Sequence, residues 1–160
     1  MQIVSNSTIL IALSRIGHLW LLEKLFNELI IPQAVYIDVV VKGAGKPGSK
    51  DVADAEWIRV FNVKDTEALD EFLSIIHRGE AEAIELALEL GVDLIILDDD
   101  IARQIAIMKG LNVVGTLAVL RQAKEKNLIP ILKPLLDALR SVGFYIGDEY
   151  NEILMDLGEL

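Results

Sequence analysis

Carboxylates stand at two places in this chain where the surrounding sequence is apolar. The apolar run 94–97 leads directly into three aspartates at 98–100, and Glu80 falls in line with Ala83, Ile84 and Ala87 at the spacing of a helix. A carboxylate buried without a partner costs several kcal/mol or gives up its charge. Such groups usually serve a cation, a basic partner or a helix N-terminus. The pattern therefore suggests a metal site.

The helix that contains Glu80 also has a simpler interpretation. Glu80 stands at its predicted start, where the macrodipole favours a carboxylate. Glu82, Glu85 and Glu89 fall together on the opposite side, and we expect all three to be solvated. Glu80 therefore has two open interpretations, a helix-start carboxylate or a ligand.

The three aspartates that follow residue 97 lie between a predicted strand and a predicted helix. One of them can cap the helix, but a single cap accounts for only one carboxylate. Ligand sites of open α/β sheets lie at the carboxyl ends of the strands. This rule predicts that the aspartates lie near the exit of the first strand, at Asn6, Ser7 and Thr8.

Asp38 is the third acidic candidate, because it stands alone among apolar residues of a predicted helix. A lone acid in such a helix must be paired, liganded or at its rim. An ion pair with Lys42, four residues further along, is the alternative to a ligand role.

Short apolar runs alternate with helix-length amphipathic segments, which is the pattern of an α/β domain with a parallel sheet. Strands are predicted at 2–5, 30–31, 57–63, 94–97 and 112–114. Helices are predicted at 7–16, 18–29, 32–41, 65–76, 80–90, 101–109, 116–126, 130–142 and 148–157. No repeat or linker divides the sequence, so we expect one domain over residues 1–160 with a helical C-terminal extension at 145–160.

Charge is spread unevenly along the chain, whose net charge is −10. Residues 51–100 carry most of the acid, whereas residues 101–134 are basic and include Arg103, Arg121 and Lys124. Global acidity argues against tight non-specific binding of nucleic acid, which depends on Lys and Arg. The basic stretch is either a solvated helix face or a path that leads to the acidic centre.

The residue composition narrows the location and the surface contacts of the protein. Cysteine is absent, which excludes disulfides, thiolate nucleophiles and Cys-based zinc sites and favours a cytoplasmic location. No apolar run approaches the ~18 residues of a membrane span, so we expect no membrane role. Hydrophobic residues make up 52% of the chain, which predicts apolar surface covered by a second copy or by another protein.

The sequence lacks the residues that several classes of enzyme need. The loop 42–50 is rich in glycine and lysine, but its order is wrong for a phosphate-binding loop and Pro47 interrupts it. A phosphatase of the haloacid dehalogenase type needs a nucleophilic aspartate after the first strand, and a dehydrogenase needs a glycine fingerprint there. Residues 5–7 supply neither.

Histidine and tryptophan give no catalytic pattern in the sequence. His18 and His77 are too isolated to indicate zinc or a general base. We interpret Trp20 and Trp57 as core or interface residues, since aromatic residues make up only 6% of the chain and offer little for base stacking.

Five segments, taken in order, resemble the PIN-domain family of metal-dependent ribonucleases, and in particular its branch related to the toxin nucleases of toxin–antitoxin pairs. The segments are VSNSTILIAL at 4–13, IPQAVYIDVV at 31–40, GEAEAI at 79–84, LDDDIAR at 97–103 and GLNVVGT at 110–116. No one segment is specific, but five in order are persuasive, and they extend from residue 4 to residue 116.

The resemblance implies a three-layer α/β/α fold with a central, mainly parallel twisted sheet. The implied ligands of Mg²⁺ or Mn²⁺ are Asn6, Asp38, Glu80 and Asp99, with Asp98 as an alternative to the last. The implied catalytic carboxylates are Asp38, Glu80 and Asp99. The implied side chains that orient phosphate, water or a neighbouring ligand are Asn6, Ser7, Thr8 and Thr116. The hydroxyls of Ser7, Thr8 and Thr116 have helix capping as their alternative role.

Asn6 stands where most active members of the family have aspartate. An amide oxygen can bind a metal ion, but it lacks the charge that makes a carboxylate bind strongly. The resemblance implies a metal-dependent endoribonuclease of toxin type, acting on RNA, with a small antitoxin-like protein and a second copy of the chain as partners. The alternative is a catalytically weak or inactive fold that binds a protein or a nucleic acid.

Overall fold

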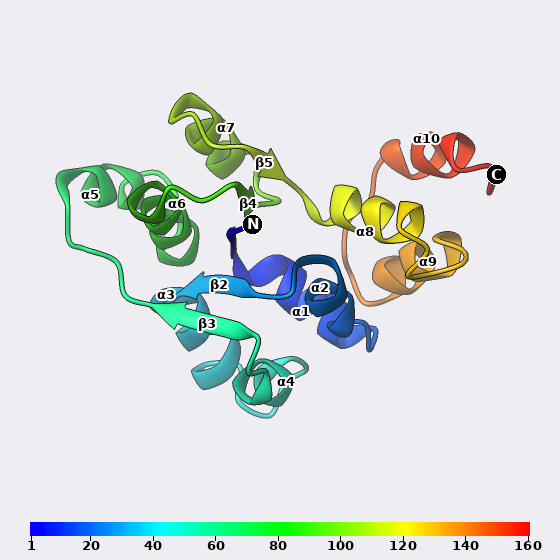
Figure 1. Cartoon of the computed structure of the whole chain (residues 1–160), viewed down its shortest axis with the longest axis horizontal. Helices are drawn as coiled ribbons and strands as arrows, with labels where there is room; N and C mark the ends of the chain where they lie inside the picture. Colours follow the sequence, from blue (N-terminus) through cyan, green and yellow to red (C-terminus); the bar gives the residue numbers. More distant parts are fainter.

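Five short apolar runs form one parallel sheet in the computed structural model, which describes all residues from 1 to 160 (Figure 1). The strands are β1 (Ile3–Ser5), β2 (Leu29–Pro32), β3 (Ile58–Phe61), β4 (Leu94–Ile96) and β5 (Val113–Val114). Their order in the sheet is β3-β2-β1-β4-β5, and every neighbouring pair is parallel. The central residue Val4 is in register with Ile30 on one side and Ile95 on the other.

Helices connect the strands, as parallel pairing requires. They are α1 (Ser7–Arg15), α2 (Trp20–Phe26), α3 (Gln33–Tyr36), the π-helix η1 (Ile37–Val41), α4 (Ser49–Asp54), α5 (Glu67–Leu73), α6 (Arg78–Leu90), α7 (Asp100–Met108), α8 (Thr116–Glu125), α9 (Lys133–Ser141) and α10 (Glu149–Asp156). In Figure 1, α8, α9 and α10 stand together at the right, and α5 and α6 at the left. No helix is both long and apolar enough to cross a membrane.

Both faces of the central strands β1, β2 and β4 are largely buried, which explains why these strands are nearly continuous apolar runs, whereas the edge strand β3 contains the exposed Arg59. Ile3 belongs to a core of 25 buried residues that includes Leu10 of α1 and Leu120 of α8. The next residue, Val4, belongs to a second core of 13 buried residues together with Ile84 of α6. Successive strand residues point to opposite faces, so the sheet separates two helical layers. The predicted three-layer α/β/α fold is confirmed.

Several predicted boundaries differ from the structure, and three of these differences change the course of the chain. The helix predicted to reach residue 29 ends at Phe26, because Asn27 turns the chain at φ 67° and β2 begins two residues later. Pro32 ends β2 and does not lie in the helix that follows. The predicted loop 42–50 ends at Gly48, because α4 begins at Ser49, and the sequence pattern did not indicate this helix.

The prediction that Glu82 and Glu85 are solvated is wrong, whereas Glu89 is exposed as expected. Glu82 is 7% exposed and accepts a hydrogen bond of 3.1 Å from the backbone N–H of Ala34 in α3. Glu85 is 5% exposed and accepts one of 3.1 Å from the hydroxyl of Thr66, the N-cap of α5. Because α3 and α5 both contact α6, this helix is covered on more than the one face that a simple amphipathic pattern assumes.

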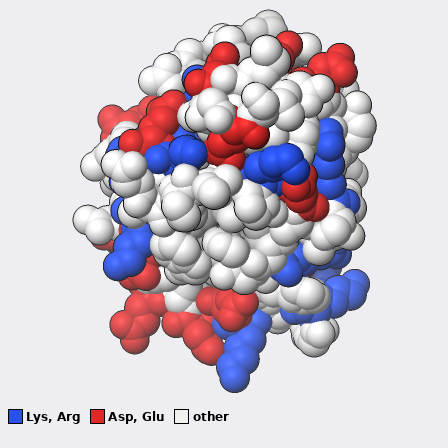
Figure 2. All heavy atoms as spheres, turned by 90° about the vertical axis from the view of Figure 1, so that its right-hand side faces the viewer, with Lys and Arg blue, Asp and Glu red and all other residues white.

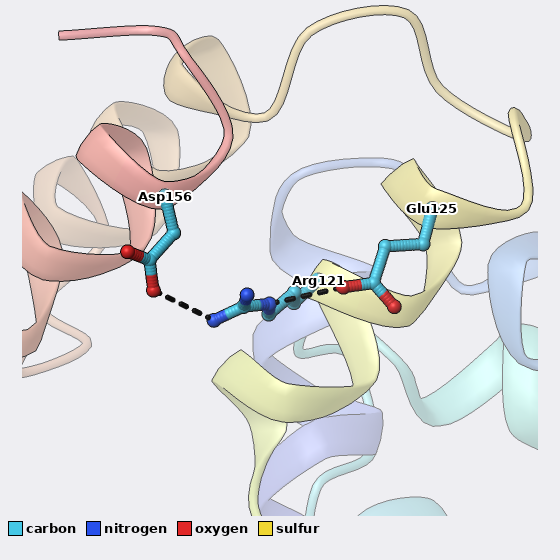
Figure 3. Close-up of polar contacts among 3 residues, drawn as sticks. All are labelled: Arg121, Glu125 and Asp156. Carbon is cyan, nitrogen blue, oxygen red and sulfur yellow. Dashed lines mark hydrogen bonds and ion pairs between the residues drawn. The ribbon is translucent and has the colours of Figure 1, made fainter.

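Two residues of the basic stretch 101–134 pair with acids of the C-terminal segment. Arg121 lies between Glu125, at 3.0 Å, and Asp156 of α10, at 3.3 Å (Figure 3). Lys124 contacts the buried carboxylate of Glu159 at 2.8 Å. Figure 2 shows acidic and basic side chains side by side on this face of the molecule. Arg121 and Lys124 are therefore held in local pairs and do not form a free basic path.

Candidate metal centre

The sheet order brings the ends of β1 and β4 together at the centre of the molecule. The backbone N–H of Asn6, just after β1, donates a hydrogen bond of 3.2 Å to the carbonyl of Ile96, the last residue of β4. The chain order reverses at β1, which has β2 on one side and β4 on the other. In open α/β sheets, ligands bind beyond the carboxyl ends of the strands at such a point.

Asn6 is 6% exposed and occupies the N-cap position of α1, but its side chain makes no capping hydrogen bond. Its Oδ1 atom instead lies 3.5 Å from the point where a β-carbon on Gly79 would stand. The hydroxyl of Ser7 contacts the same Oδ1 at 3.5 Å. The amide oxygen of Asn6 is therefore directed toward the start of α6 and has no strong hydrogen-bond partner there.

Asp38 approaches the same point from η1. Its Oδ2 atom lies 3.2 Å from the β-carbon position of Gly79, while its Oδ1 lies 3.8 Å from the Nζ of Lys42. Both side chains of this ion pair are exposed, at 43% for Asp38 and 73% for Lys42, so the pair is weak. The two interpretations of Asp38 are thus compatible, because one oxygen faces Lys42 and the other faces Gly79 and Asn6.

Glu80 is 7% exposed in the first turn of α6. Burial raises the pKa of its carboxyl above the usual 4.5, and the negative charge of Asp99 raises it further. A hydrogen bond from the backbone of His77 and the charge of the His77 side chain act in the opposite direction. Glu80 is a helix-start carboxylate, and it is also held close enough to Asp99 for the two to repel each other.

Asp99 and Asp98 have different surroundings although they are adjacent. Asp99 caps α7, because its Oδ2 accepts a hydrogen bond of 2.9 Å from the backbone N–H of Ala102. Asp98 accepts two hydrogen bonds from Thr116, one of 2.8 Å from its backbone N–H and one of 2.6 Å from its hydroxyl. Thr116 is fully buried. Asp98 and Thr116 therefore join the end of β4 to the start of α8.

One hollow of about 340 Å³ collects most of the predicted site residues, and no hydrophobic residue lines it. Its lining residues are Asn6, Ser7, Thr8, Asp38, His77, Gly79, Glu80 and Asp99. Asp98 and Thr116 do not line it. The sequence had given no role to His77, yet this residue is the N-cap of α6, three positions before Glu80. Its place immediately before a helix that begins with a candidate ligand is the signal that could have identified it.

The oxygen atoms of this hollow fit a hydrated divalent cation. Three carboxylates and one amide provide hard donors, and the absent side chain of Gly79 leaves room between Asp38 and Asn6. No three His, Asp or Glu side chains converge closely enough to enclose an ion by themselves. Mg²⁺ does not require such a cage, because it keeps several waters and uses few carboxylates.

Two further hollows border the acidic one. The first, of about 240 Å³, shares Ser7 and Thr8 with it and extends along α1 to Arg15 and Phe144. The second, of about 370 Å³, shares His77, Glu80 and Asp99 with it and extends to apolar side chains. These apolar side chains are Leu73, Ile75, Ile76 and Ile101. The acidic hollow thus adjoins two other hollows through different lining residues.

Comparison with known protein families gives one match that covers nearly the whole chain. A family model described as a PIN domain matches residues 2–159. No curated protein matches the chain significantly.

Proposed function

Because the chain belongs to the PIN-domain family, which has a nuclease fold and generally uses divalent metal ions, we propose that it is a metal-dependent endoribonuclease that hydrolyses RNA phosphodiesters. The observation that carries the proposal is the convergence of Asn6, Asp38, Glu80 and Asp99 in one hollow without hydrophobic lining. These residues come from four different elements of the chain. Carboxylates that repel one another are not expected to converge on a surface that binds no cation.

The carboxylates of Asp38, Glu80 and Asp99 would hold the cation, and Asn6 would add a neutral oxygen. Bound Mg²⁺ or Mn²⁺ supplies polarisation of the scissile phosphate and a bound water of lowered pKa. The hydroxyls of Ser7 and Thr8, in the first turn of α1, line the same hollow and would donate hydrogen bonds to a phosphate oxygen. The raised pKa of Glu80 supports this assignment, because a cation would relieve its repulsion from Asp99.

The neighbouring hollows support an extended RNA strand as the substrate. They adjoin the acidic hollow through different lining residues, so a strand whose phosphate lies at the carboxylates would have space for neighbouring nucleotides. Phe144 lines one of them, and Ile76 and Ile101 line the other. Such surfaces suit unpaired bases, which proteins recognise when they are splayed out of a helix.

Replacement of Asp99 by asparagine tests the proposal. Asparagine caps helices about as well as aspartate, so the Asp99→Asn protein should fold. We expect it to lose Mn²⁺ binding, measured by calorimetry, and RNA cleavage, measured on the same samples. Asp98→Asn is the matched control, because it changes the adjacent aspartate outside the hollow and should keep both properties. Undiminished cleavage by Asp99→Asn would refute the proposal.

Asn6 favours a second candidate function, a weak or inactive nuclease fold that binds a protein or a nucleic acid. The Asn6→Asp variant distinguishes the two, because it restores a fourth carboxylate to the hollow. Increased Mn²⁺ affinity together with increased cleavage would identify a functioning nuclease centre. If neither the wild-type protein nor the variant binds the ion at millimolar concentration or cleaves RNA, the binding function is the better assignment.

We also propose that the protein is a toxin-type nuclease of the cytoplasm that forms a homodimer. Two apolar side chains of α7 support the dimer, since Ile107 is 58% and Met108 85% exposed. Burial of such side chains stabilises association. Sedimentation of the wild-type protein and of Ile107→Glu tests the dimer, and a monomeric wild-type protein would contradict it.

A further inference from the structure

A separate hollow lies between the end of α1, the start of α2 and α4. Its volume is about 410 Å³, and its walls include Trp20, Trp57, Glu23, Asp51 and Asp54. Trp57 immediately precedes β3, so this hollow lies near the amino end of that strand. It shares no lining residue with the acidic hollow of the candidate metal centre.

The carboxylates of this second hollow have no cationic partner. Glu23, Asp51 and Asp54 are exposed, no ion pair of the chain involves them, and no Lys or Arg lines the hollow. Glu23 and Asp51 lie in the first turns of α2 and α4, where the helix favours a negative charge. Asp54 is the last residue of α4, where the helix end is negative and disfavours it. Together they create a negative field that a bound cation would neutralise.

The two tryptophans give the hollow a second property that suits a cation. Trp20 is 42% exposed, which excludes the core and leaves the interface as its predicted role, and Trp57 is half-buried. The ring of His18 lies 5.9 Å from that of Trp20, at 34° to it, and supports the indole. Indole is the aromatic group that attracts cations most strongly. A flat guanidinium can stack on an indole while its N–H groups donate to a carboxylate, which an ammonium cannot do as well.

The hydrogen-bond acceptors of the hollow match one class of cation. Ser14 also lines the hollow, but its Oγ atom is buried and lies toward Gly48, where an added β-carbon would be 3.2 Å from it. The acceptors open to the hollow are therefore its three carboxylates. A guanidinium has five N–H donors and no acceptor, which matches carboxylates without a cationic partner.

We propose that this hollow binds an arginine side chain presented by another protein. Arginine and tryptophan are enriched among the residues that dominate protein interfaces. The three carboxylates would repel the phosphates of RNA, so the hollow is not part of the RNA path. The proposal is independent of the nuclease activity, because it concerns different residues.

Tryptophan fluorescence tests the proposal directly, because the only two tryptophans of the chain are both in this hollow. The probe is the peptide acetyl-Gly-Arg-Gly-amide, and its neutral control contains citrulline in place of arginine. We expect the arginine peptide to change the emission in a saturable way and the citrulline peptide to have no effect. The Asp51→Asn/Asp54→Asn double variant should weaken binding by roughly tenfold or more.

The matched control is Asp148→Asn/Glu152→Gln, which removes two exposed carboxylates near and in α10 and should bind like the wild-type protein. Thermal unfolding of both double variants verifies that they are folded. No saturable change with the arginine peptide would overturn the proposal. Equal binding of spermidine would overturn it in favour of a small polyamine. Dissociation of a wild-type dimer by the Asp51→Asn/Asp54→Asn change would overturn it in favour of a second copy of the chain.

Discussion

Replacement of Gly79 by alanine adds one methyl group at the point where Asp38 and Asn6 meet. The new β-carbon would lie 3.2 Å from Asp38 Oδ2, 3.5 Å from Asn6 Oδ1 and 3.6 Å from a methyl of Val35. The first distance is shorter than ordinary contact, so the Asp38 carboxylate must move by a few tenths of an ångström. The substitution changes no charge and removes no ligand. It tests geometry alone.

Stability and metal binding should change in opposite directions in this variant. Alanine is favoured over glycine in a helix by about 0.5–1 kcal/mol, and the close contact with a mobile carboxylate offsets only part of this gain. Misplacement of a catalytic group by about 1 Å can lower the rate a hundredfold. A shift of the Asp38 carboxylate by a few tenths of an ångström, with a methyl group where a water would lie, should therefore lower Mn²⁺ affinity and cleavage rate by about tenfold. We therefore expect unchanged or higher thermal stability with about tenfold weaker Mn²⁺ binding and cleavage.

Calorimetry with Mn²⁺, cleavage of a single-stranded RNA and thermal unfolding are measured on the same protein. Gly147→Ala is the matched control, since its β-carbon would lie 3.0 Å from the flexible carboxylate of Glu149 and Gly147 does not line the acidic hollow. Unchanged Mn²⁺ affinity in Gly79→Ala would show that Asp38 and Asn6 do not bind the ion together. A parallel loss of stability and binding would show that the contact disrupts the fold, and the reasoning would fail.

Three further predictions concern the neighbouring contacts. Because burial and the charge of Asp99 raise the pKa of Glu80, the ionised Glu80 destabilises the fold near neutral pH. Glu80→Gln should therefore raise the free energy of unfolding by about 1 kcal/mol while it abolishes Mn²⁺ binding. Denaturant unfolding that shows no gain in stability would contradict this reasoning. Thr116→Val removes the hydroxyl that donates to Asp98 and should cost about 1–3 kcal/mol in the same assay without weakening Mn²⁺ binding, whereas a loss of binding would mean that Asp98 acts at the metal. For Glu159, burial opposes ionisation, but hydrogen bonds from Lys124 and the backbone of Leu132 and Lys133 outweigh it and lower the pKa. The stabilisation of the fold by the ionised Glu159 is present above the usual pKa of 4.5 and is lost as the pH falls through the lowered pKa of the folded protein. Glu159→Gln should therefore destabilise the protein by about 1–3 kcal/mol at pH 7 and progressively less in acid. An equal loss of stability at all pH values would refute the assignment of this stabilisation to the charge of Glu159.

Pairing partners decided most of the differences between the predicted and observed side-chain environments. Glu82 falls on the same predicted face of the helix as the exposed Glu89, but the backbone N–H of Ala34 in α3 lies beside Glu82 and donates a hydrogen bond to it. Asp98 and Asp99 could not be distinguished by sequence, because either can follow a strand and precede a helix. The start of α8 resolves them, since the N–H and hydroxyl of Thr116 both donate to Asp98.

Sequence alone determined the class of fold and the set of acidic candidates. The period of the apolar residues depends only on local geometry, so the alternation of strands and helices could be predicted without knowledge of contacts. The rule for parallel sheets then placed Asn6 and the aspartates after β4 at one edge. Their roles as metal ligands stay a prediction.

Only the tertiary structure decided which oxygen atoms face the hollow and which are used elsewhere. The distances from Gly79 to Asp38 and Asn6, the repulsion between Glu80 and Asp99, and the arrangement of Trp20 and Trp57 around unpaired carboxylates all join residues far apart in the chain. The physical reason is that burial and electrostatic interaction depend on distance in space, which sequence spacing does not fix beyond one helix or strand.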